Sequence, residues 1–191
     1  MRRSKMMSFQ EQIKMHEVTV KAFKESCIPS LEKIVDVCRD ALKSGHKILL
    51  CGNGGSAADS QHIAAEFVGR FHKERVSLPA IALTTDTSIL TAVANDYDYD
   101  IVFSRQVEGL GQSGDVLIGI STSGNSVNII RAVETAKDKG IMTVAFTGEK
   151  ASKLSEIADI TLCAPSNVTA RIQECHILAG HLICSAIDEE Y

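Results

Sequence analysis

From about residue 8 to residue 44, apolar residues recur with the periodicity of a helix and charged residues are interspersed among them. Apolar side chains recur there at steps of three, four or seven, which places them on one helix face. They are Ile13, Val20, Phe23, Cys27, Leu31, Ile34, Cys38 and Leu42. Pro29 interrupts the pattern, so we predict two helices, with Ser30 as the N-cap of the second.

The rhythm changes after Gly45, where short apolar runs alternate with loops of small polar residues and further helical patterns. The predicted strands lie at 47–52, 78–85, 115–122, 141–148 and 158–165. The predicted helices follow at about 56–72, 86–95, 99–111, 126–139, 151–157 and 167–189. Strands that are apolar on both faces and alternate with helices are typical of a parallel sheet covered on both sides.

The fold class that follows is α/β: a doubly wound, five-stranded parallel sheet flanked by helices, with an N-terminal helical extension. No low-complexity linker and no internal repeat divides the sequence, so we expect one domain over residues 1–191. Within it, residues 1–45 form the helical extension and residues 46–191 form the α/β sandwich.

The net charge of −4 gives no electrostatic reason to expect a nucleic-acid partner. The one basic cluster, at Arg2, Arg3 and Lys5, is interpreted as a solvated, partly mobile end. No apolar stretch reaches the roughly 20 residues that span a bilayer, and residues 1–25 lack the apolar centre of a secretory signal. We therefore expect a cytoplasmic protein without a membrane partner.

The six cysteines contain no CxxC pair, and most of them lie inside apolar runs. A thiol in such a run behaves as a small buried hydrophobe. We predict reduced core residues, and no zinc–thiolate site, for Cys27, Cys38, Cys51, Cys163, Cys175 and Cys184.

A glycine-rich loop, Gly52–Ser56, follows the first predicted strand, at the end where such sheets bind ligands. Its three glycines let backbone N–H groups approach a ligand closely. Ser56 can cap the next helix, whose N-terminus attracts an oxyanion. The loop matches neither GxGxxG nor a Walker A motif, so it gives little support for a nucleotide. An ordinary tight turn explains the loop equally well.

A serine-rich loop, Ser121–Ser126, follows the third predicted strand. Its four hydroxyls and its glycine can supply donors around a phosphate without a fixed cation. Helix capping by Asn125 or Ser126 is the alternative, but capping requires one residue rather than four. We favour phosphate binding.

Directly after the glycine loop, His62 and Glu66 lie four residues apart and share a helix face. An imidazole and a carboxylate near a polar pocket suit acid–base chemistry or metal ligation. Taken alone, such a pair is more often a surface contact. Further along, Asn95 and Asp96 either end a helix or bind sugar hydroxyls, and the sequence leaves both open.

The last predicted helix is apolar over most of its circumference, which is typical of a helix buried in a subunit interface. Gln173 and His181 would then be largely desolvated and would need polar partners. We interpret His176 on the same helix as a core histidine with a satisfied hydrogen bond.

Together these motifs resemble the phosphoheptose isomerases, a family of sugar-isomerase (SIS) domain proteins. The matching segments are CGNGGSAADSQHIAAEFVGRF, LPAIALTTD, TAVANDYDYD, ISTSGNS and RIQECHILAGHLICSAID. The resemblance implies conversion of sedoheptulose 7-phosphate into D-glycero-D-manno-heptose 7-phosphate, the first step of bacterial heptose (ADP-heptose) synthesis for lipopolysaccharide or capsule. It also implies a homotetramer with intersubunit active sites, in which residues 1–45 serve in oligomer packing.

The resemblance also implies roles for individual residues. Glu66 matches the catalytic carboxylate and His181 the catalytic imidazole. The implied substrate contacts are Asn53, Gly54, Gly55, Ser56, Glu66, Asn95, Asp96, Ser121, Thr122, Ser123, Ser126 and Gln173. Some members bind zinc through residues that match His62, Glu66, Gln173 and His181. One zinc ion per subunit is therefore expected.

Ketose–aldose exchange moves a proton between adjacent carbons through an enediol. We expect Glu66 to shuttle the carbon proton and His181 to manage the oxygen protons and ring opening. If zinc takes Glu66 as a ligand, the metal could instead polarise the carbonyl. Gln173 and His181 are about 12 Å apart along a straight helix. To share a metal they would need side chains that lean together, a bent helix or a ligand from another subunit.

Two rival interpretations remain. A non-catalytic SIS-fold tetramer that binds the replication initiator protein shares both loops, but is expected to lack the residues that match Glu66 and His181. A sugar-phosphate-sensing regulator would carry a helix-turn-helix or a basic surface stripe, and the sequence has neither. The sequence therefore favours the isomerase.

Overall fold

The computed structural model describes residues 7–191, so the basic cluster at Arg2, Arg3 and Lys5 lies outside the described residues. Its strands are β1 (Ile48–Gly52), β2 (Ala80–Ala82), β3 (Val116–Ile120), β4 (Met142–Thr147) and β5 (Ile160–Cys163). Its helices are α1 (Phe9–Ser26), α2 (Ile28–Lys43), α3 (Gly55–Val68), α4 (Thr87–Asp96), η1 (Tyr99–Ile101), α5 (Ser104–Leu110), α6 (Val127–Asp138), α7 (Lys153–Ile157) and α8 (Thr169–Asp188). None of these helices has the length and hydropathy needed to cross a membrane.

The five strands form one parallel sheet in the order β2-β1-β3-β4-β5, which confirms the predicted class. The chain runs from β1 out to β2 and then returns past β1 to β3. Because of this reversal, the loops after β1 and β3 leave the sheet in neighbouring positions, where Gly52 pairs with Ile120. Open α/β sheets bind ligands at such a switch point, so the glycine and serine loops occupy the expected crevice.

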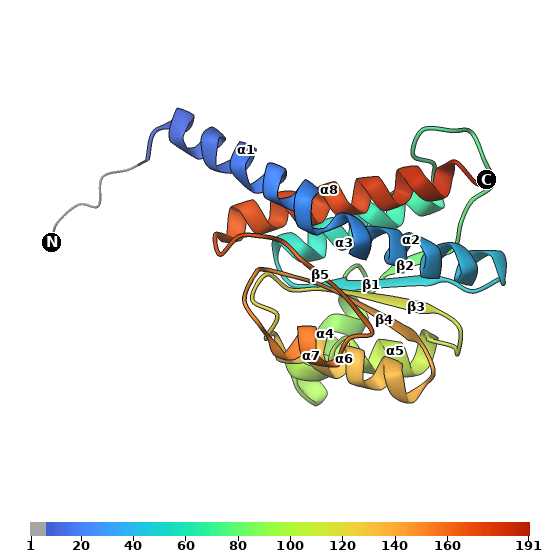
Figure 1. The fold of residues 1–191 in the computed structure, drawn as a ribbon. Helices are drawn as coiled ribbons and strands as arrows, with labels where there is room; N and C mark the ends of the chain where they lie inside the picture. The colour runs from blue at the N-terminus through green and yellow to red at the C-terminus, as the bar shows by residue number, and fades with distance from the viewer. Residues whose placement is uncertain (1–6) are drawn as a thin grey trace, which may run out of the picture.

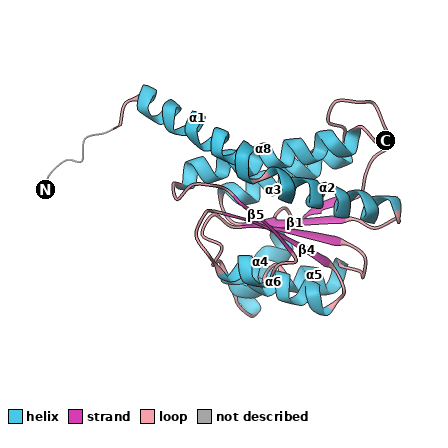
Figure 2. Cartoon of the chain, in the orientation of Figure 1, coloured by secondary structure: helices cyan, strands magenta, loops and turns pink. Residues whose placement is uncertain are grey.

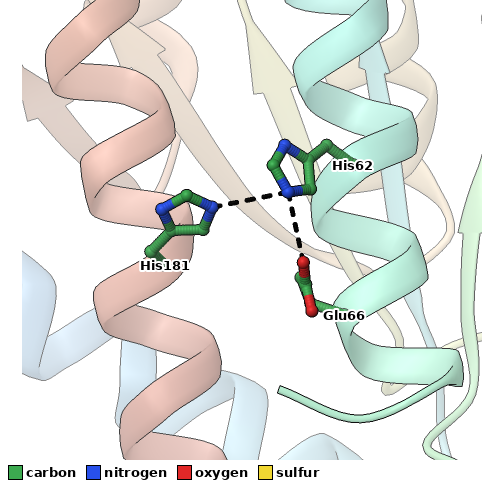
Figure 3. Close-up of side chains that lie close together, drawn as sticks. All are labelled: His62, Glu66 and His181. Carbon is green, nitrogen blue, oxygen red and sulfur yellow. Dashed lines mark hydrogen bonds and ion pairs between the residues drawn. The ribbon is translucent and has the colours of Figure 1, made fainter. Parts of the chain in front are cut away.

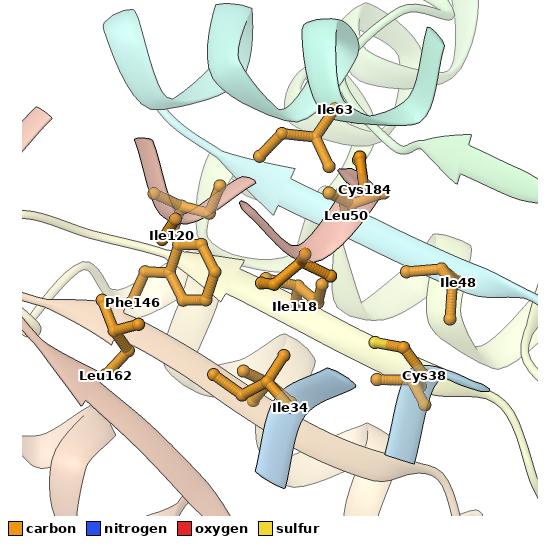
Figure 4. Packing of buried hydrophobic residues seen from close by; sticks show 14 of the residues in the cluster. Ile34, Cys38, Ile48, Leu50, Ile63, Ile118, Ile120, Phe146, Leu162 and Cys184 are labelled. Carbon is orange, nitrogen blue, oxygen red and sulfur yellow. The ribbon is translucent and has the colours of Figure 1, made fainter. Parts of the chain in front are cut away.

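Two helical layers cover the sheet, with α2, α3 and α8 on one face and α4 to α7 on the other (Figures 1 and 2). Alternate residues of each strand supply the two layers. Ile48 and Leu50 of β1 pack towards α2, α3 and α8, whereas Leu49 and Cys51 pack towards the opposite layer. Figure 4 shows the first of these clusters, in which Phe146 lies between Ile120 and Leu162.

The N-terminal extension consists of two helices, as predicted, but Ser30 does not cap the second. α2 begins at Ile28, with Cys27 in the N-cap position and Pro29 in its first turn. The first backbone N–H groups of a helix have no partner within the helix, so proline is tolerated there and does not delay the start. The predicted helix at 99–111 is also divided, into η1 and α5.

All six cysteines are free, in agreement with the predicted reduced state. Five of them are buried, but Cys163 at the end of β5 is exposed, so its assignment to the core was wrong. β5 lies at the edge of the sheet, where one side of a strand has no neighbour, and its sequence pattern alone does not reveal that position.

His176 on α8 is a core histidine, as the sequence predicted, and has no exposed surface. Its Nε2 donates to the carbonyl of Thr147 at 3.0 Å, and its buried Nδ1 has no partner. Burial lowers the pKa of His176 to about 4, although the bond to Thr147 acts in the opposite direction. The imidazole is therefore neutral in the folded protein at neutral pH.

This lowered pKa makes stability depend on pH. The unfolded chain, with an ordinary histidine pKa of 6.5, binds the proton more readily, so stability is lost as pH falls from 6.5 towards 4. Between pH 7 and pH 5 the loss from this group is on the order of 2 kcal/mol. The free energy of unfolding can be measured by urea unfolding at pH 7 and pH 5. We expect it to fall by about 2 kcal/mol less in a His176→Leu variant than in the wild type. The same pH dependence in both proteins would rule out His176 as the source.

Candidate active site

The glycine loop turns tightly from β1 into α3. Gly54 has a φ of 57° and occupies the N-cap position, where no side chain accepts a hydrogen bond. A Cβ on Gly52 would lie 2.6 Å from the carbonyl oxygen of Ser56, so only glycine fits there. The prediction that Ser56 caps the helix was wrong, because α3 begins at Gly55 and Ser56 is buried in its first turn.

In the serine loop, hydroxyl groups gather at the end of β3. The hydroxyl of Ser121 lies 3.0 Å from that of Ser126 and 3.4 Å from that of Ser123. Ser126 holds the N-cap position of α6, as one alternative predicted, but its side chain makes no capping bond and contacts Ser121 instead. Thr122 and Ser123 line a hollow of about 310 Å³ together with Lys150. The loop thus offers hydroxyl groups and a nearby cation to an anionic group.

A reciprocal pair of amides joins the two loops. Asn53 donates to the side-chain oxygen of Asn128 at 2.8 Å, and Asn128 donates back at 2.9 Å. Asn128 lies in the first turn of α6 and is 4% exposed, and the hydroxyl of Tyr99 reaches the oxygen of Asn53 at 3.5 Å. Asn128 was not assigned a role from the sequence, because it lies 75 positions from Asn53 and a pairing over that distance leaves no local pattern.

His62, Glu66 and His181 come together between α3 and α8 (Figure 3). Nε2 of His62 lies 3.1 Å from Oε1 of Glu66 and 3.5 Å from Nε2 of His181. One possible ligand atom from each residue lies within 4.8 Å of the others. A Cβ on Gly180 would lie 2.6 Å from the side chain of Ile63, so α3 and α8 pack closely beside the two histidines.

The donor set of this cluster fits a zinc ion. Two imidazoles and one carboxylate are the protein ligands of many catalytic zinc sites, which keep a further position for water or substrate. His62 is 48% exposed and Glu66 23%, so the group is accessible from solvent. The same atoms also suit proton transfer, since a carboxylate and an imidazole lie within one hydrogen bond of each other.

Asp59 lies one turn before His62 and was not assigned a role from the sequence. Its Oδ2 is buried without a hydrogen-bond partner. Burial raises the pKa of Asp59, against the lowering effect of His62 and His181 nearby. An unpartnered carboxylate oxygen beside two histidines is typical of a functional site, and its position three residues before His62 was the available signal.

Gln173 lies at the other end of the α3–α8 contact, where its side-chain nitrogen is 2.4 Å from the position that a Cβ on Gly55 would occupy. Like His181, it is half-buried rather than fully desolvated. Among the described residues, no hydrogen bond joins Gln173 to His62, Glu66 or His181. The structure therefore places its amide beside the glycine loop and the other three residues further along the helices.

Asn95 and Asp96 are the last residues of α4, which agrees with the helix-end alternative. Both are exposed, and the amide of Asn95 donates to Asp96 at 2.8 Å. Within the described part of the chain, no hydrogen bond connects them to either loop. They remain open to a ligand.

Comparison with known proteins places this chain in a family. The model of the SIS domain family matches residues 13–148. The phosphoheptose isomerase of Nitratiruptor sp. is 59% identical over 155 residues, which cover 81% of this chain and 83% of that protein. That of Aquifex aeolicus is 56% identical over 92% of this chain and 97% of its own. The chain belongs to the phosphoheptose isomerase family.

Solved structures of the family have the same fold. The phosphoheptose isomerase from Neisseria gonorrhoeae matches with a TM-score of 0.88 and 43% identity, covering 95% of this chain and 100% of that one. The protein from Francisella tularensis matches with a TM-score of 0.90 and 37% identity, covering 96% and 100%. The Vibrio vulnificus NanR protein, at 20% identity and a TM-score of 0.68, shares the fold alone. These comparisons do not support the alternative of a partner-binding tetramer.

The closeness of Gly55 to Gln173 permits a test of the predicted role of the glycine loop. We expect Gly55→Ala to lower kcat/KM roughly three- to tenfold, because the new methyl group displaces the Gln173 amide from any hydrogen bond to a ligand. Folding stability should not fall, since alanine is favoured over glycine in a helix by about 1 kcal/mol. Gly109→Ala, where a Cβ meets nothing within 4 Å, is the control. A Gly55→Ala variant with wild-type kcat/KM would exclude a role for Gln173 at this position.

Proposed function

We propose that this chain is a ketose–aldose isomerase that converts sedoheptulose 7-phosphate into D-glycero-D-manno-heptose 7-phosphate. The observation that carries the proposal is the cluster of His62, Glu66 and His181 beside two ligand loops. Its support comes from relatives at 53–59% identity that are named phosphoheptose isomerase. The reaction would begin bacterial heptose synthesis for lipopolysaccharide or capsule, in the cytoplasm, where free cysteines remain reduced.

The substrate is held at its two ends. The hydroxyls of Ser121, Thr122, Ser123 and Ser126 bind the phosphate group. The sugar end extends towards the glycine loop, where Asn53, Gly54, Gly55, Ser56 and Gln173 form its contacts. Asn95 and Asp96, at the end of α4, supply further contacts to the sugar. Because Asn53 is paired with Asn128, the two ends of the site keep a fixed separation.

The proton transfers follow from the cluster. After the sugar ring opens, Glu66 removes a proton from C1 of the ketose while the C2 oxygen gains one from His181, which gives the enediol. Glu66 then returns the carbon proton to C2, and His181 accepts the proton of the C1 hydroxyl, which leaves the aldehyde at C1. The carboxylate and imidazole end each cycle in their starting protonation states.

Zinc is proposed as the cofactor, with His62, Glu66 and His181 as its ligands. Gln173, whose amide lies beside the glycine loop in this chain, would serve as a fourth ligand from another subunit. When bound, the ion would act as a Lewis acid on the substrate oxygens. Chelation followed by addition of zinc tests this. Activity lost on chelation and recovered with zinc supports the ligand set, whereas full activity in metal-free protein excludes the metal from the reaction.

A homotetramer with shared active sites is proposed on the basis of α1. This helix exposes large apolar side chains, with Phe9 82%, Ile13 60% and Val18 58% exposed. A second copy of the chain would cover them, since solvated apolar surface of this kind is unfavourable. Light scattering coupled to gel filtration distinguishes a tetramer from a monomer.

The isomerase itself is tested by ¹H NMR of sedoheptulose 7-phosphate incubated with the protein. New anomeric signals from the aldose, absent with Glu66→Gln or His181→Gln, would support the proposal. Intact substrate binding without conversion by the wild type would instead favour a non-catalytic, partner-binding protein.

A further inference from the structure

Residues 69–79, which connect α3 to β2, cross to the C-terminal end of α8, and we call this segment the strap (Figure 1). The strap contains no helix or strand. Its course is fixed instead by three kinds of contact. Arg75 forms a buried ion pair with Asp188 and hydrogen bonds to the end of α3, and Phe71 makes an aromatic contact with His181.

Asp188, in the last turn of α8, anchors the strap. Its Oδ2 accepts the backbone N–H of His72 at 2.8 Å and of Lys73 at 2.6 Å, and its Oδ1 accepts Nε of Arg75 at 2.6 Å. Both charged side chains are only 1% exposed. Burial raises the pKa of Asp188, but the hydrogen bonds from Lys73, His72 and Arg75 outweigh it and lower the pKa to about 2.

Arg75 extends this anchor to α3. Its Nη2 donates to the carbonyl of Glu66 at 2.8 Å, and its Nη1 donates to the carbonyl of Phe67 at 2.9 Å. The last carbonyls of a helix have no partner within the helix, and the guanidinium of Arg75 bonds two of them at the end of α3. The backbone of Glu66 is thereby tied through Arg75 to the end of α8.

Phe71 connects the strap to the cluster by packing against His181. Its ring centroid lies 5.6 Å from that of His181 and 4.1 Å from that of His72, whose amide is held by Asp188. The ring of His62 approaches His181 at 5.0 Å and 73°. His181 is therefore packed between a side chain of the strap and a side chain of α3.

We propose that the strap is a positioning element for the site, in which the Arg75–Asp188 pair and Phe71 together hold Glu66 and His181 in register. None of the three residues transfers a proton; each acts through the two residues that do. This inference rests on the proposed function, which assigns the chemistry to Glu66 and His181.

Asp188→Asn tests the anchor, and the chain offers a matched control. Asp115 has no exposed surface and lies away from the site. Like Asp188, it accepts two backbone N–H groups, from Lys47 and Gln112, and it pairs with one cationic side chain, that of Lys47. We expect Asp188→Asn to lower kcat roughly ten- to a hundredfold with little change in KM, because small displacements of reacting groups are costly. Asp115→Asn should lose stability but keep the wild-type kcat.

Two structural readouts accompany the kinetics. Hydrogen exchange at the amides of His72 and Lys73 should become faster in Asp188→Asn and stay slow in Asp115→Asn. The ring signals of His181, assigned by their loss in His181→Gln, should shift in Asp188→Asn. Phe71→Leu, which leaves the ion pair in place, should lower kcat and shift the same signals without speeding exchange at the two amides.

These outcomes separate the strap from the proposed function. If the wild type fails to convert sedoheptulose 7-phosphate, the proposed function fails, and the His181 signals still test the strap. Wild-type kcat and unshifted His181 signals in Phe71→Leu would overturn the strap proposal, as would an equal fall in kcat in Asp115→Asn and Asp188→Asn. Should Asp188→Asn not fold, Phe71→Leu decides the question alone.

Discussion

Replacing Glu66 with glutamine is expected to lower kcat for heptose phosphate isomerisation roughly 10²- to 10⁴-fold, the usual contribution of a positioned acid or base. The amide has nearly the shape of the carboxylate and can still bond to His62, which lies 3.1 Å away. It cannot accept a proton from carbon. Binding of the phosphate end of the substrate should persist, because the serine loop belongs to a different strand end.

Isotope exchange makes this prediction specific. In D₂O the wild type should incorporate deuterium at the substrate carbon as it turns over, and Glu66→Gln should not. Glu108→Gln, which alters an exposed carboxylate paired with Arg105 on α5, is the control and should retain full activity. Near wild-type turnover by Glu66→Gln would remove Glu66 from the proton transfer. Loss of bound zinc together with turnover would assign it to the metal instead.

The second large effect is expected at Gly124 in the serine loop. Gly124 has a φ of 65°, and a Cβ there would lie 2.0 Å from Oγ and 2.4 Å from Cβ of Ser152. Ser152 is 5% exposed and caps α7, and Leu154 bonds to the carbonyl of Gly124, so this neighbour cannot move aside freely. Gly124→Ala should therefore displace the loop and raise KM for the sugar phosphate on the order of 10²-fold.

Gly45→Ala separates backbone strain from this displacement. Gly45 also has a positive φ, of 81°, but a Cβ there would meet nothing within 4 Å. The Gly45→Ala substitution should lower the free energy of unfolding by only roughly 1–2 kcal/mol, which is the cost of an alanine in the left-handed conformation, and should leave KM unchanged. Steady-state kinetics and urea unfolding on both variants provide the comparison. Equal KM values for Gly124→Ala and the wild type would show that the loop does not bind the phosphate.

Local errors in the sequence prediction have a common physical cause. Ser30 and Ser56 were assigned as caps because serine favours that position, yet both helices begin earlier, at Ile28 and Gly55. Proline is tolerated in a first turn, and the positive φ of Gly54 starts α3 without a side-chain cap. Helix starts depend on backbone geometry at two or three residues, which composition alone does not specify.

The composition of the site was only partly predictable. His62 and Glu66 were expected to share a face because a helix repeats every 3.6 residues, and they lie one hydrogen bond apart. Whether His181 lies beside them depends on how α3 packs against α8, where Gly180 lets the side chain of Ile63 approach closely. Asn128 was missed for the same reason, since packing supplies its partner Asn53. Asp59 was missed although its position three residues before His62 was visible in the sequence.

The sequence by itself determined the α/β class, the five strands and the positions of the glycine and serine loops, because each follows from a periodicity within a single element. It also specified the residues that carry the family resemblance. Only the tertiary structure decided that Gln173 lies beside Gly55 while His181 lies beside His62, and that Arg75 and Asp188 join the ends of α3 and α8. Those contacts depend on which helix faces pack together. The packing is set by the burial of apolar surface throughout the fold, which no single element specifies.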